Sequence, residues 1–81
     1  MLKIKDNISL EELEKYGFTL LPCGTSHSIF KEYPKTNDEM DISFSHSTRV
    51  LDIYISDVCL LNELSDILFN LIQAGLVEKV D

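Results

Sequence analysis

The strongest constraint on the fold is an amphipathic helix pattern near the C-terminus that ends at a glycine and leads directly into a short strand pattern. Its apolar residues recur three and four positions apart, on one stripe: Leu60, Leu61, Leu64, Ile67, Leu68, Leu71 and Ile72. Gly75 follows, where helices commonly end with a left-handed residue. Residues 76–80 then read as a strand. Because the stripe must be buried, we expect a long helix lying on a sheet.

A second, shorter helix is expected near the N-terminus. Ser9 and Glu12 have the spacing of a capping box, and Ile8 and Leu13 have the spacing of a hydrophobic staple. Gly17 stands where a left-handed residue would end the helix. Local sequence therefore specifies both ends of a two-turn helix.

The middle of the chain has the period of two that is typical of strands. Between residues 39 and 45, Met40, Ile42 and Phe44 alternate with polar residues, so one strand face meets a core and the other meets water. Further strand patterns occur at residues 2–5, 18–21, 27–33 and 49–55. We predict one α+β domain over residues 1–81, with a short N-terminal helix, an antiparallel meander of three to four strands, a long C-terminal helix packed on the sheet, and a short closing strand. If the closing strand pairs within the same sheet, it should lie parallel to its neighbour.

The charge of the chain restricts its partners. Fourteen acidic residues against seven basic ones give a net charge of -7 over 81 residues. Such a surface repels nucleic acid and anionic lipid and attracts a basic partner, although the charge can also serve solubility alone. The sequence contains no apolar run long enough for a membrane span and no leader pattern, so we expect a cytoplasmic protein that binds neither membranes nor nucleic acid directly.

The best candidate binding surface combines carboxylates and tyrosines on the middle strands. Glu39 and Asp41 share one strand face, and Asp52 lies on the outer face of the paired strand. Tyr54 beside them and Tyr33 from the preceding strand would add aromatic anchors of the kind that interfaces favour. The alternative is a solvated face without a partner.

The two cysteines and two histidines form the ligand inventory of a zinc site, but their spacing does not support one. Structural zinc ligands usually come as close pairs, and of Cys23, His27, His46 and Cys59 only the first two are near each other. We therefore expect no metal, no cofactor and reduced thiols. Cys23 and His27 could also act as a thiolate and its base, but no third orienting group is evident.

Both ends of the chain resemble a family of small uncharacterised proteins encoded by phages and prophages of Gram-positive bacteria. The resemblance rests on residues 4–18, 66–68 and 71–80. The middle strands lie outside it. The resemblance implies a bacterial host cell and favours binding over catalysis, because the matching positions are caps, glycines and core apolar residues.

We therefore expect a non-enzymatic, acidic phage-type protein that binds a protein partner. The most specific form of this hypothesis is an inhibitor that mimics nucleic acid and thereby blocks a host or defence factor. One alternative is a metal-binding or thiol-dependent enzyme that uses Cys23 and His27. Another is an accessory or virion-assembly protein that self-associates through an open sheet edge.

Overall fold

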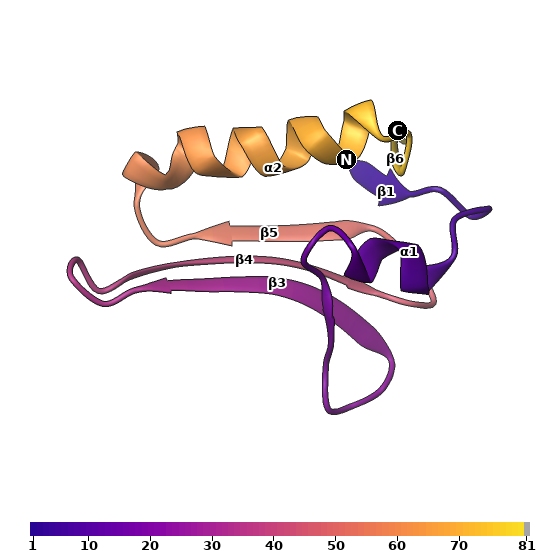
Figure 1. Cartoon of the computed structure of the whole chain (residues 1–81), viewed down its shortest axis with the longest axis horizontal. Helices are drawn as coiled ribbons and strands as arrows, with labels where there is room; N and C mark the ends of the chain where they lie inside the picture. The colour runs from indigo at the N-terminus through magenta and orange to yellow at the C-terminus, as the bar shows by residue number, and fades with distance from the viewer. Residues whose placement is uncertain (81) are drawn as a thin grey trace.

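Two antiparallel sheets and a C-terminal helix make up the computed structural model, which describes residues 1–80 (Figure 1). In chain order the elements are β1 (Leu2–Ile4), α1 (Leu10–Glu14), β2 (Thr19–Leu20), β3 (Ser26–Tyr33), β4 (Asp38–Ser45), β5 (Leu51–Ile55), the 3-10 helix η1 (Val58–Leu60), α2 (Leu61–Gln73) and β6 (Val77–Lys79). The predicted α+β class is confirmed.

Strands β2 to β5 form the predicted antiparallel meander, in the order β2-β3-β4-β5. The alternation in β4 is the reason for its central place, because Met40, Ile42 and Phe44 all point to one face and are no more than 2% exposed. We call this the inner face. It carries most of the sheet's contribution to the core.

Helix α2 packs on the inner face and runs along the sheet in Figure 1. Leu64 and Leu71 are buried, as is Leu60 in the 3-10 turn that precedes the helix. The prediction of a long helix is wrong: α2 has 13 residues, because Asp57 caps η1 and Gly75 ends the helix. No helix within residues 1–80 is long and apolar enough to cross a membrane.

The closing strand does not join the main sheet. Strand β6 pairs antiparallel with β1, with Ile4 opposite Val77, in a separate two-stranded sheet. The condition for a parallel pairing is therefore not met, because β6 pairs with the opening strand β1 instead. Ile4 is fully buried, so this small sheet also closes one end of the core.

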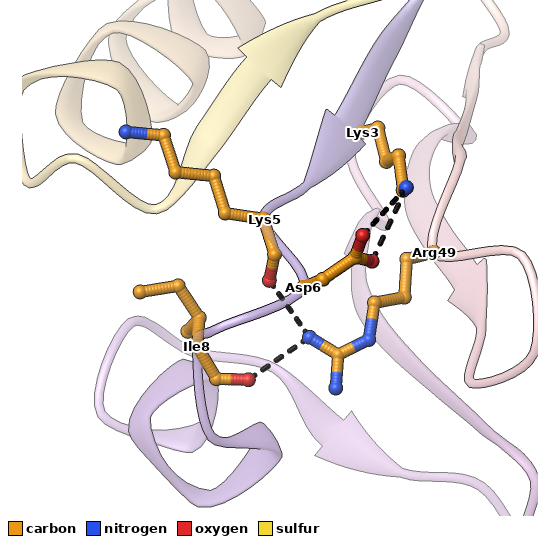
Figure 2. A network of polar contacts seen from close by, with 5 residues as sticks. All are labelled: Lys3, Lys5, Asp6, Ile8 and Arg49. Atoms are coloured by element: carbon orange, nitrogen blue, oxygen red, sulfur yellow. Dashed lines mark hydrogen bonds and ion pairs between the residues drawn. The ribbon is translucent and has the colours of Figure 1, made fainter.

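Arg49 fastens the N-terminal segment to the turn between β4 and β5 (Figure 2). Its guanidinium Nη1 donates to the carbonyl oxygens of Lys5 at 2.8 Å and Ile8 at 2.9 Å. Beside it, Lys3 pairs with Asp6 at 3.2 Å. The backbone of Arg49 is left-handed, with φ of 60°, so these contacts hold a conformation that the residue would otherwise avoid.

Helix α1 has the predicted N-cap, Ser9, but it ends at Glu14, before the predicted Gly17, and is only five residues long. Ser9 caps it by accepting from the backbone N–H of Glu11 at 3.3 Å. Gly17 has φ of +102°, and the N–H of Phe18 then bonds back to the carbonyl of Leu13. Leu13 and Phe18 are both buried, so this turn anchors the short helix in the core.

Gly75→Val should lower the free energy of unfolding by at least about 1 kcal/mol. Gly75 has φ of +75° and an added Cβ would meet nothing within 4 Å, so the loss comes from backbone conformation alone. Chemical denaturation would measure it. Gly75→Asn should lose less, because asparagine tolerates this conformation; equal losses in the two variants would contradict the explanation.

Arg49→Ala should lower the free energy of unfolding by about 1.5 to 3 kcal/mol, since it leaves two half-buried carbonyl groups without a charged donor. Arg49→Gly removes the same side chain but relieves the left-handed backbone, so it should be more stable than the alanine variant by about 1 kcal/mol. Denaturation of the two variants side by side would separate the hydrogen bonds from the backbone strain.

Candidate functional site: an acidic and aromatic sheet face

The outer face of the four-stranded sheet is the face opposite α2. The registers of β3, β4 and β5 arrange its side chains in three cross-strand rows. The rows are Ser28, Ser43 and Asp52; then Phe30, Asp41 and Tyr54; then Glu32, Glu39 and Ser56. Carboxylates therefore occupy every row, and the central row places one between two aromatic rings.

The central row is the most unusual part of this face. Phe30 and Tyr54 are 51% and 54% exposed, and Asp41 stands between them in register. The carboxyl Oδ1 of Asp41 is buried and has no hydrogen-bond partner within residues 1–80. Burial raises the pKa of Asp41, and the charge of Asp52 raises it further. This carboxylate is thus held in a partly desolvated position, and residues 1–80 supply no counter-charge to it.

The other two predicted carboxylates flank this row and are exposed. Glu39 is anchored through its backbone, whose N–H donates to Ser56 Oγ at 2.8 Å, so its side chain is free to turn outward. Asp52 borders a hollow of about 420 Å³ on the outer face, beside small residues that include Ser43, Ser45 and Val50. The outer face therefore offers a depression next to its charged side chains.

The structure does not bring Tyr33 to this face. Lys31 pairs with the buried Met40 across the strands, so Tyr33, two residues on, also lies on the inner side. Its hydroxyl donates to Glu63 of α2, which also accepts from Lys31 at 2.9 Å. The hydrogen bond to Glu63 raises the pKa of Tyr33 to about 12 and lowers the pKa of Glu63. Tyr33 therefore joins helix to sheet.

Phe30 is the member of the site that the sequence analysis missed. It lies in the strand pattern at residues 27–33, whose alternation is weaker than that of β4. The turn after Tyr33 sets the register that places Phe30 opposite Asp41. Alternation along the strand could have predicted that Phe30 faces outward, because the residue next to a buried Ile29 must point to the opposite face of the sheet.

The histidines form a pair inside the fold. His27 Nδ1 lies 2.7 Å from His46 Nε2, and the His27 ring stacks on Phe44 with centroids 5.8 Å apart. His27 is only 4% exposed, and its burial lowers its pKa, with a smaller contribution from His46. The two nitrogens lie within hydrogen-bonding distance, so one imidazole donates an N–H and the other accepts it.

The cysteines lie apart from the histidine pair in their contacts. Cys23 is exposed and accepts from Thr25 Oγ1 at 3.4 Å, which lowers its pKa. Cys59 is also exposed and lies with Asp38 and Asp57, where their candidate ligand atoms fall within 4.8 Å of one another. The four predicted ligands are thus divided between three places. In the Cys59 cluster, Asp57 caps η1 by accepting from the N–H of Cys59 at 2.8 Å, and the Cys59 thiol donates to Asp38 at 3.8 Å.

The chain matches no protein-family model, no curated protein and no solved structure.

Asp41→Asn should raise the free energy of unfolding at pH 7 by about 1 kcal/mol or less. Because the folded pKa is raised, the folded state binds the proton more tightly than the unfolded chain, and the ionised carboxylate weakens the fold above that pKa. The advantage of the variant should therefore shrink as the pH falls toward the ordinary value of 3.8. Denaturation at both pH values would measure it. Asp66→Asn removes the same charge from an exposed position and should show no such pH-dependent gain.

Proposed function

We propose that this protein is a non-enzymatic binding domain whose outer sheet face receives a basic segment of a protein partner. The single observation that carries the proposal is Asp41, a carboxylate without a counter-charge between two half-exposed aromatic rings. A lysine or arginine side chain entering this row would supply the missing charge. The rings of Phe30 and Tyr54 could then hold the cation by cation–π contact.

The surroundings of the central row support a macromolecular partner. The three rows extend across β3, β4 and β5, and Glu32, Glu39 and Asp52 place further negative charge on either side of Asp41. A protein surface with several basic residues would complement this distribution, and the net charge of -7 would speed its approach. Nucleic acid would be repelled by the same charges.

The finer form of the proposal is inhibition of a host or defence factor. A row of carboxylates on a sheet could occupy a basic groove that normally holds nucleic acid. The resemblance of the two chain ends to small phage and prophage proteins supports this setting. The outer face lies on the middle strands, outside the segments that carry that resemblance.

Thiol chemistry has less support from the geometry. His27 is buried and hydrogen-bonded to His46, and the thiol of Cys23 contacts Thr25 instead of a base. The lowered pKa of Cys23 is a property of an exposed loop thiol with hydroxyl neighbours. Neither contact supplies the nucleophile and base pair that such an enzyme needs.

Reversal of the three predicted carboxylates to lysine, at Glu39, Asp41 and Asp52 together, should abolish binding of a basic partner. An arginine-rich peptide is a suitable first probe, titrated into isotopically labelled protein and followed by NMR. The wild-type shifts should centre on Phe30 and Tyr54 and weaken as salt is added, since exposed charges are screened.

The control variant carries the same three reversals at exposed carboxylates outside the outer face, at Glu11, Asp66 and Glu78. It has the same net charge and should retain peptide shifts on the central row. If both triple variants lose binding equally, net charge alone explains the effect and the surface assignment fails. Affinity capture from host lysate with the same three proteins would extend the test to natural partners.

A further inference from the structure

Helix α2 carries a second apolar stripe that the fold leaves uncovered, and it includes Leu61 and Ile72, for which the prediction of burial is wrong. Its members are Leu61, Phe69 and Ile72, together with Val58 of η1, and they are 47%, 57%, 51% and 76% exposed. Leu61 and Ile72 lie almost in line, because eleven residues make about three helical turns. The buried stripe of Leu64 and Leu71 lies on a different side of the same helix.

This second stripe is directed toward the free edge of the sheet. Glu63, two residues after Leu61, lies on roughly the opposite side of the helix and contacts Lys31 of β3 at 2.9 Å. Leu61 and Ile72 therefore project on the other flank, the side of β5. Strand β5 is the last strand of the sheet, and its inner-face residue Ile53 is 38% exposed. The stripe and Ile53 thus belong to one apolar border.

The backbone edge of β5 beside this border is also open. The N–H of Ser56 donates to the carbonyl of Glu39 in β4, so alternation directs the peptide groups of Ile53 and Ile55 away from β4. Strand β1 covers only the start of β5, through a bridge between Lys3 and Val50. An open strand edge next to exposed apolar side chains is a ready template for pairing with another chain.

The second stripe itself contains no charged residue, although 26% of the chain is charged. The polar residues interspersed with or next to the second stripe are Asn62, Ser65 and Gln73, and both charged residues of α2, Glu63 and Asp66, lie outside it. Depletion of charge around exposed aromatic and aliphatic side chains is typical of interface centres. The helix contact between two copies, each of net charge -7, would therefore not oppose like charges directly.

We propose that this border is a self-association surface, on which a second copy of the chain forms a two-fold dimer. Strand β5 would pair antiparallel with its counterpart, and the two α2 helices would pack side by side over the joined sheet. The five exposed side chains present roughly 400 to 500 Å² of apolar surface, so two copies would bury close to the lower limit of about 1,000 Å² for a specific interface. The paired edges add main-chain hydrogen bonds to this area.

Sedimentation analysis of the full chain, over a concentration series that reaches about 1 mM, tests the proposal. The wild type should approach twice the chain mass of 9.3 kDa and no more. Ile72→Glu and Ile72→Lys should each raise the dimer dissociation constant by on the order of tenfold or more, because either charge would be desolvated in the interface. Asn70→Glu and Asn70→Lys carry the same charges on an exposed position outside the stripe and should leave the dimer intact.

Amide hydrogen exchange of the wild type gives an independent measurement that needs no variant. The N–H groups of Ile53 and Ile55 should exchange slowly at high concentration and faster on dilution. This measurement also decides the matter if the Ile72 variants lose their far-ultraviolet circular dichroism. Four results would each overturn the proposal. Two concern the wild-type mass: a monomer at every concentration, or a mass that grows beyond the dimer. The other two are a dimer whose dissociation constant does not change with a charge at Ile72, and Ile53 and Ile55 amides that exchange freely in the dimer.

Discussion

The burial of one stripe of α2 against the inner face of the sheet is the interaction on which the rest of the structure depends. Leu60, Leu64 and Leu71 meet the inward side chains of the central strands, and without the helix this face would be open to water. A domain of 81 residues has little surface to bury, so it has room for one such contact. The small β1–β6 sheet and α1 close the ends of this core.

This arrangement leaves two different surfaces for interaction. The outer sheet face is acidic and aromatic, and it suits a partner that brings positive charge. The border of α2 and β5 exposes apolar side chains, and we propose that it binds a second copy of the chain. Because the two surfaces lie on opposite sides of the edge strand β5, a dimer joined at the border would present two outer faces on one continuous sheet.

Much of the fold could be predicted from local patterns. The period of two in residues 39–45 placed Met40, Ile42 and Phe44 inward, and Gly17 and Gly75 marked helix ends. The pairing of the closing strand could not be predicted in this way, since β6 and β1 lie at opposite ends of the chain. The same limit applied to the partners of Phe30 and Tyr33, since they depend on the register set by the turn at residues 34–37 and on the packing of α2.

The sequence by itself determined the α+β class, the positions of the strands and the acidic character of the chain, because periodicity, caps and charge are local properties. Only the tertiary structure decided which side chains meet. It put Asp41 between Phe30 and Tyr54, turned Tyr33 inward to Glu63, and left one flank of α2 uncovered beside an open strand edge. The physical reason is that register and packing join residues far apart in the chain, and a one-residue change in register would exchange the two faces of the sheet.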